Sequence, residues 1–326
     1  MIEKATKRAV FSPQRHREHR ENSPPCSLCL CGESVLFLAL VFLTPFWLLA
    51  QETTIKLTVR LVNITATVRG PDGQLARALT REDFEVLDEG QAQAIRVFAR
   101  EAEVPLSIAL LLDISGSTAK DLKFEQDSAS RFARSILREQ DRIALFPFND
   151  EVTQATAFTS SAIRLEQVLR SVRPGGGTSL FDAIFLAAEQ LRRQQGRKVM
   201  ILVTDGGDTT SHIGFKEALR AAQESDAVLY SIIVVPIRSD AGRDTAGEHA
   251  LQLLSEGTGG RFYTPENAAQ LDPVFAGIAD ELHTQYVLGF YADPNLAAGG
   301  YRRVQVRVLS PGFTVQARKG YYLRGR

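Results

Sequence analysis

The stretch LLLDISGST, residues 110–118, joins a buried strand directly to a carboxylate and two serine hydroxyls. Residues 106–112 are apolar except for one serine, a pattern that favours a strand covered on both faces, as in a parallel sheet. Asp113 therefore falls at the carboxyl end of this strand, Gly116 permits a tight turn, and a helical pattern begins at Thr118. Since ligands bind at the carboxyl ends of strands in open α/β sheets, this stretch predicts a binding site at the mouth of such a sheet.

The side chains in this stretch indicate what the site would bind. Asp113, Ser115 and Ser117 offer only hard oxygen donors. Such donors suit Mg²⁺, Mn²⁺ or Ca²⁺ rather than zinc or copper. The alternative is that these residues only cap the following helix, which is a common role for Ser, Thr and Asp.

Two further loops of the same kind follow along the chain. The apolar run 199–203 leads through a threonine to Asp205, which is again a carboxylate at the end of a strand. Between the two strands lies GGGTS, residues 175–179, a flexible loop that presents two hydroxyls before another helix. Ser179 with Asp182 would fit a plain capping box. Three such loops in this order are nevertheless difficult to assign to capping alone.

Five residues from these three loops resemble the metal-ion-dependent adhesion site, or MIDAS, of von Willebrand factor A-type domains. They are Asp113, Ser115, Ser117, Thr178 and Asp205. The resemblance covers roughly residues 104–283. It implies a doubly wound, Rossmann-like α/β fold with a mostly parallel sheet of six strands. Residues 152–158, which follow a short turn, are assigned to the one antiparallel edge strand.

The same resemblance implies a division of roles within the site. Ser115 and Ser117 are expected to coordinate a Mg²⁺ ion directly, with Mn²⁺ or Ca²⁺ as alternatives. Thr178 is expected to do so in a ligand-bound state, while Asp113 and Asp205 act partly through water. An open coordination position would then accept an Asp or Glu carboxylate from a partner protein. This expectation agrees with the preference of a hard divalent ion for anionic oxygen ligands.

The segments on either side of this domain have the period-two pattern of β-strands. Residues 51–103 and 284–326 each contain too few apolar residues for an independent core. We therefore predict that they pack into one small β-sandwich-like module, with the α/β domain inserted between its halves. Two separate hairpins docked on the central domain are the alternative. A change of phase between Leu61 and Val62 predicts either a bulge in the first strand or a strand that changes sheets.

The first 50 residues are predicted to direct export. Residues 1–33 are polar and basic, whereas residues 34–50 carry no charge and are mostly apolar. We interpret residues 1–50 as a signal peptide or a signal anchor. The protein is then periplasmic, at the cell surface or secreted, with inner-membrane attachment through residues 34–50 as the alternative to cleavage. All three cysteines precede residue 34, so the remainder of the chain forms no disulfide.

Composition and motifs exclude several classes of function. The formal net charge is zero, so nothing favours binding to nucleic acid or to an anionic membrane surface. No Gly-x-x-x-x-Gly-Lys phosphate loop occurs, and Ser115 lacks the leading glycine of a nucleophile elbow. The histidines after residue 50 are not placed by the sequence to activate this serine. They are His212, His249 and His283.

These observations favour a non-enzymatic, divalent-metal-dependent protein-binding domain of the adhesion type in an exported bacterial protein. The flanking strands resemble those of bacterial proteins in which such a domain is joined to a small β module. One alternative is a structural scaffold component of an envelope complex, in which the ion only stiffens the loops. Another is a hydrolase that uses the metal to activate water.

Overall fold

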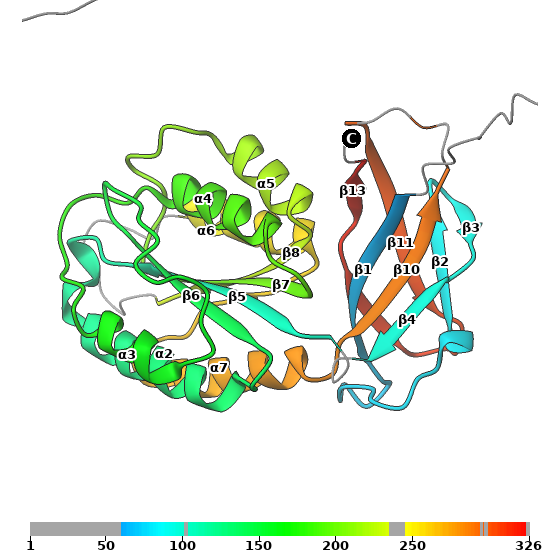
Figure 1. The fold of residues 1–326 in the computed structure, drawn as a ribbon, viewed down its shortest axis with the longest axis horizontal. Helices are drawn as coiled ribbons and strands as arrows, with labels where there is room; N and C mark the ends of the chain where they lie inside the picture. Colours follow the sequence, from blue (N-terminus) through cyan, green and yellow to red (C-terminus); the bar gives the residue numbers. More distant parts are fainter. Residues whose placement is uncertain (1–59, 101–103, 235–244, 294–295, 297–298, 324–326) are drawn as a thin grey trace, which may run out of the picture. The chain divides into compact units, whose positions relative to one another are not determined.

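The structure of the chain is a computed structural model. It describes residues 60–100, 104–234, 245–293, 296 and 299–323. The predicted signal or anchor segment and the start of the first predicted strand, residues 1–59, lie outside the described residues. Within the described part of the chain, no helix is both long and apolar enough to cross a membrane. An α/β domain and two antiparallel β-sheets make up the fold (Figure 1).

The α/β domain is built on a five-stranded parallel sheet with the strand order β6-β5-β7-β8-β9. The strands are β5 (Leu106–Asp113), β6 (Arg142–Phe148), β7 (Arg197–Thr204), β8 (Ala227–Ile233) and β9 (Phe262–Tyr263). β5 lies between β6 and β7, and all of its residues are buried. The parallel α/β sheet predicted from the apolar run is therefore confirmed.

Helices cover both faces of this sheet (Figure 1). One face packs against α2 (Leu122–Ile136), α3 (Ala162–Leu169) and α7 (Leu271–Leu282), and the other against α4 (Leu180–Arg192), α5 (Phe215–Glu224) and α6 (Thr245–Thr258). The 3-10 helices are η1 (Arg81–Asp83), η3 (Ser117–Lys120) and η4 (Ala268–Gln270). Successive residues of β5 alternate between the two cores, since Leu110 belongs to the first and Leu111 to the second. Burial on both faces explains why the strand is continuously apolar.

The predicted sixth strand is wrong, because the sheet has five strands. Residues 152–158 do run antiparallel beside β6, but the pairing is irregular. It consists of two isolated bridges, Phe148 with Val152 and Ile143 with Thr159, and of backbone hydrogen bonds from Thr153 to Pro147 and from Ala155 to Leu145. Between the bridges, the Leu145 N–H donates to the side-chain hydroxyl of Thr156 at 2.9 Å instead of to a backbone carbonyl. Pro147 in β6 has no N–H to donate. The hydrogen-bond ladder with β6 is therefore interrupted, and residues 152–158 do not form a regular strand.

The flanking segments contribute strands to both antiparallel sheets. One sheet has the order β12-β1-β10-β4 and the other β13-β11-β2-β3. The N-terminal strands are β1 (Arg60–Arg69), β2 (Phe84–Asp88), β3 (Gln91–Gln93) and β4 (Val97–Arg100), and the C-terminal ones are β10 (Tyr286–Ala292), β11 (Tyr301–Val308), β12 (Thr314–Ala317) and β13 (Gly320–Tyr322). A single hydrophobic cluster contains residues of both sheets. The two sheets therefore share one core, as in a β-sandwich.

The predicted bulge between Leu61 and Val62 is absent from the structure. β1 pairs with β10 in an unbroken antiparallel register from Arg60 opposite Ala292 to Ala66 opposite Tyr286. Val62 is buried, whereas the Leu61 side chain retains 44% of its exposure. Leu61 is thus an apolar residue on the solvent side of a regular strand.

Candidate metal-binding site

The three predicted loops converge at the carboxyl end of the parallel sheet. β5 and β7 are adjacent, with Leu112 opposite Val203, so the chain leaves both strands at neighbouring points. The loop before α4 is held against the loop after β5 by two backbone hydrogen bonds. The Gly175 N–H donates to the Ile114 carbonyl at 2.8 Å, and the Gly116 N–H donates to the Gly176 carbonyl at 3.0 Å.

Four of the five predicted site residues are connected by a short chain of hydrogen bonds. The hydroxyls of Ser115 and Ser117 lie 3.0 Å apart, and Ser117 donates to Asp205 Oδ1 at 2.9 Å. Asp113 Oδ1 accepts from the Ser115 N–H at 2.8 Å, while its Oδ2 accepts from the Thr204 hydroxyl at 2.6 Å. Two carboxylates and two hydroxyls from two separate loops are therefore brought together.

The backbone of Thr178 is hydrogen-bonded to the loop that follows β7. Its N–H donates to the Thr209 hydroxyl at 2.8 Å, and its carbonyl accepts from the Thr209 N–H at 2.9 Å. The preceding Gly176 has a φ of +80°, and a Cβ there would lie 2.2 Å from Asp150 Oδ2. Glycine at this position therefore permits both a left-handed backbone and the close approach of a carboxylate.

Nearby polar residues fix the loops. Asp208 accepts from the backbone N–H groups of Leu180 and Phe181 at the start of α4, which stabilises the helix terminus. Asp150 Oδ1 accepts from the Gly177 N–H at 2.7 Å. Both carboxylates therefore hold the loops in place, Asp150 from an exposed position and Asp208 from a half-buried one.

The alternative capping box at the start of α4 does not form. The Ser179 hydroxyl donates to the Asp150 carbonyl at 3.1 Å and lies 2.9 Å from the Thr210 hydroxyl. Asp182 instead accepts from the backbone N–H groups of His212 and Ile213. Neither side chain is used to close the helix terminus in the reciprocal way that a capping box requires.

The electrostatics of the site indicate an excess of negative charge. Asp113 is fully buried, and burial raises the pKa of its carboxyl from 3.8 to about 6, against the lowering effect of hydrogen bonds from Thr204 and Ser115. Burial also raises the pKa of Asp205, although the bond from Ser117 opposes this. No lysine or arginine contributes to either shift. A divalent cation would supply the positive charge that balances these carboxylates.

A third carboxylate, Glu125, was missed by the sequence reasoning. It lies in the first turn of α2 and is 1% exposed. Burial, followed by the charges of Asp113, Asp205 and Asp121, raises its pKa from 4.5 to about 8. A signal was present in the sequence, because the glutamate stands among the apolar positions of this helix, three residues after Leu122.

The donor set fits a hard cation. Within the residues that the structure describes, no group of three or more His, Cys, Asp and Glu side chains is arranged to hold a metal. The candidate site differs in kind, because its five residues combine two carboxylates with three hydroxyls. Oxygen-only sets of this kind suit Mg²⁺, Mn²⁺ or Ca²⁺.

Among the described residues, no histidine is hydrogen-bonded to the Ser115 hydroxyl. This hydroxyl pairs with that of Ser117, and the Ser115 N–H donates to Asp113. His212, the histidine nearest to these loops in the chain, places its Nδ1 at 2.9 Å from Asp182 Oδ2. The described residues therefore form no pair of a serine and an activating histidine around Ser115.

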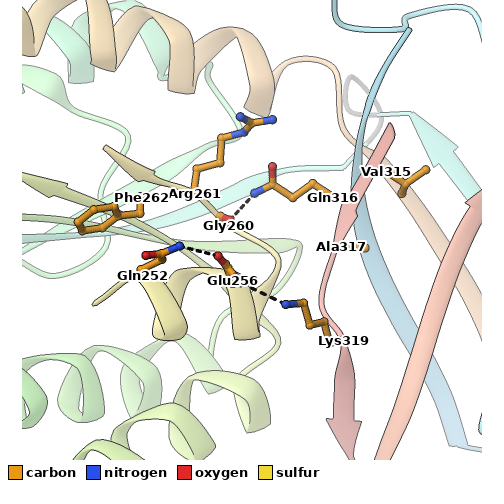
Figure 2. A pocket seen from close by; sticks show the side chains of 9 residues that line it. All are labelled: Gln252, Glu256, Gly260, Arg261, Phe262, Val315, Gln316, Ala317 and Lys319. Atoms are coloured by element: carbon orange, nitrogen blue, oxygen red, sulfur yellow. Dashed lines mark hydrogen bonds and ion pairs between the residues drawn. The ribbon is translucent and has the colours of Figure 1, made fainter. Parts of the chain in front are cut away.

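A separate hollow of about 430 Å³ lies between α6, β9 and β12 (Figure 2). Its charged groups are already paired: Lys319 with Glu256 at 3.1 Å, and Arg261 with the buried Glu281 at 2.7 Å. Gln316 donates to the Gly260 carbonyl across the hollow. Because these charged and polar groups are already paired with one another, the hollow offers no free group to a ligand. It resembles a polar contact between packed elements more than a binding site.

Comparisons with known proteins identify the family of the α/β domain. The chain matches the model of the von Willebrand factor type A domain over residues 107–276, which is more than half of its length. No curated protein matches the chain.

Solved structures similar to this chain include three bacterial proteins. The vWF domain of the type V pili tip protein Mfa5 from Porphyromonas gingivalis has 17% identity and a TM-score of 0.46, covering 54% of this chain and 94% of that one. The conserved hypothetical protein BatB from Bacteroides thetaiotaomicron has 24% identity and a TM-score of 0.44, covering 54% and 97%. A von Willebrand factor type A protein from Catenulispora acidiphila has 11% identity and a TM-score of 0.48, covering 82% and 75%.

Proposed function

We propose, from the premise that the chain belongs to the von Willebrand factor type A domain family, that its α/β domain binds a partner protein through a divalent metal ion and catalyses no reaction. Domains of this family are generally interaction modules. The observation that carries the proposal is the hydrogen-bonded cluster of Asp113, Ser115, Ser117 and Asp205 at the carboxyl end of the sheet. Its buried carboxylates have raised pKa values and no cationic side chain to balance them.

In this proposal the five MIDAS residues divide the work of holding the ion. Ser115 and Ser117 bind it directly, while Asp113 and Asp205 supply charge, partly through water. Thr178 adds its hydroxyl when a ligand is engaged. The ion supplies an open coordination position that attracts an Asp or Glu carboxylate of the partner, because a hard divalent cation prefers anionic oxygen.

We also propose that the protein acts outside the cytoplasm of a bacterium. The support is the sequence of residues 1–50, in which a basic segment precedes the uncharged residues 34–50. The location is then periplasmic, at the cell surface or secreted, with attachment to the inner membrane if the segment is retained. Detection of the mature N-terminus by mass spectrometry distinguishes cleavage from anchoring.

The metal is tested by titration calorimetry with Mg²⁺ and Mn²⁺. The unmodified protein is expected to bind one ion, and Asp113→Ala is expected to lose this binding because it removes a buried charge from the cluster. Glu139→Ala is the matched control, since it removes an exposed carboxylate just before β6, at the opposite end of the sheet. Equal binding by the unmodified protein and Asp113→Ala would remove the site.

A second variant separates partner binding from metal binding. Thr178→Ala is expected to weaken binding of a partner protein far more than it weakens Mg²⁺ binding, because the hydroxyl is proposed to bind the ion only when a ligand is engaged. The partner is the protein that co-purifies in Mg²⁺ and is released by a chelator. Thr178→Ser keeps the hydroxyl and should restore partner binding. Parallel losses of both affinities in Thr178→Ala would contradict this role.

A further inference from the structure

Glu125 is a buried carboxylate without a partner. It projects from α2, whose neighbouring residues Leu122 and Ala129 belong to the core between this helix and the sheet. Both of its carboxylate oxygens are buried and make no hydrogen bond. Burying a charged or polar group in this way is costly unless something compensates it.

The other buried glutamates show how this protein normally compensates such a group. Among the described residues, three glutamates are buried: Glu125, Glu166 and Glu281. Glu166 pairs with Arg134 and Arg170, and Glu281 pairs with Arg69 and Arg261. Each of these two carboxylates therefore lies between two guanidinium groups, in the arrangement expected of a buried charge.

Glu125 has the opposite surroundings. The charges that act on it most strongly are those of Asp113, Asp205 and Asp121, all of the same sign as its own. Two of these residues belong to the proposed metal site. The carboxylate therefore lies within electrostatic reach of the proposed metal site. Positive charge together with N–H or O–H donors would satisfy its unpaired oxygens.

We propose that Glu125 is an outer-sphere residue of the metal site, accepting a hydrogen bond from water bound to the ion. This inference rests on the proposed function, since it requires the metal. It goes beyond the five MIDAS residues by adding a third carboxylate from α2. Contact through water agrees with the finding that no three acidic, cysteine or histidine side chains among the described residues are arranged to hold one ion directly. A hydrated divalent cation brings both the charge and the donors that the surrounding side chains lack.

The test compares Mg²⁺ affinity in the full chain by calorimetry. Glu125→Gln keeps the shape of the side chain but removes its charge, and the dissociation constant is expected to rise about 10- to 100-fold, as for other outer-sphere partners. Glu166→Gln is the matched control, because it alters a buried glutamate that faces arginines instead of the site. Its Mg²⁺ affinity should stay unchanged.

A second readout distinguishes this role from a purely structural one. In the presence of a chelator, Glu125→Gln should melt at the same temperature as the unmodified protein or higher, since the amide replaces an uncompensated acid. If Glu125→Gln fails to fold, Glu125→Asp withdraws the carboxylate by one methylene and should still weaken Mg²⁺ binding. Unmodified protein that binds no ion would overturn the proposed function and this inference with it. Normal binding by the unmodified protein and equal affinity in the folded Glu125 variant would overturn the inference alone.

Discussion

Deletion of residues 284–326 is expected to unfold strands β1 to β4, although none of their own residues is removed. β10 lies between β1 and β4, and β11 lies between β2 and β13. The deletion therefore removes a central strand from each sheet, together with Tyr286, Leu288, Phe290, Val304 and Val306 from the shared core. The remaining strands would keep neither their hydrogen-bonded neighbours nor a hydrophobic face to pack against.

Limited proteolysis and hydrogen exchange measure this effect. Residues 60–100 should lose protection, while the α/β domain retains it because its two cores are formed without the deleted residues. Unchanged protection of residues 60–100 would instead support two independent hairpins.

A pair of point variants isolates the role of the core. Val306→Asp places a charge in the shared core and should reproduce the loss of protection. Gln305→Asp adds the same charge to an exposed position of the same strand and should not. Unfolding by both variants would point to the strand itself rather than to the core that it covers.

The fold of the α/β domain could be predicted because its pattern is local. The apolar run of β5 and the carboxylate at its end are adjacent in the sequence, and a run of this length favours a strand that is buried on both faces. The same holds for the other two loops of the site. Their convergence follows from topology, since the carboxyl ends of neighbouring parallel strands lie at one edge of a sheet.

The sixth strand could not be resolved in this way. Residues 152–158 have a strand-like pattern, but regular pairing depends on what the neighbouring strand offers. Thr156 uses its hydroxyl for the Leu145 N–H, and Pro147 offers no N–H at all. The bulge expected in β1 is a second feature that the pattern along the chain could not decide. Leu61 is apolar yet exposed. The change of phase in the sequence therefore comes from an apolar side chain on the solvent side of a regular strand, and not from a bulge.

Glu125 shows where a sequence pattern stops being informative. Its position on the apolar face of α2 was visible, but buried glutamates have two opposite meanings in this protein. Glu166 and Glu281 are paired with arginines, and Glu125 faces aspartates. Which case applies depends on groups as far away in the sequence as Asp205, so only the folded arrangement decides it.

The metal-free protein is expected to lose stability as the pH rises from about 5 to 8. The pKa of Asp113 is raised from 3.8 to about 6 in the folded state, so the folded protein holds this proton more tightly than the unfolded chain does. The resulting stabilisation is fully present below the unfolded value and is lost as the pH rises through the folded one. A difference of about two pKa units corresponds to about 3 kcal/mol in all, of which about 1.4 kcal/mol is lost between pH 5 and 6. Glu125, whose pKa is raised from 4.5 to about 8, adds a further loss across the whole of this range.

Other carboxylates act in a different pH window. The pKa values of Asp83 and Glu89 are lowered, chiefly by hydrogen bonds from the backbone N–H groups of Thr80 and Arg303. Their contribution to stability is present above their ordinary pKa values and is lost only as the pH falls below them. They therefore do not oppose the expected decline between pH 5 and 8.

Thermal unfolding in a chelator, at intervals between pH 5 and 8, measures the decline. Asp113→Asn should remove the part of the decline below about pH 6, because it removes the titrating charge while keeping an oxygen acceptor for Thr204. The part caused by Glu125 should remain. Saturating Mg²⁺ should flatten the profile, because an ion bound to the folded state alone adds about 2.7 kcal/mol at 100 times its dissociation constant. Protons and the ion compete for the same carboxylates, so this added stability should grow as the pH rises. A melting temperature that is constant across the range in the chelator, or a decline that persists unchanged in Asp113→Asn, would show that the charge of Asp113 is already compensated within the protein.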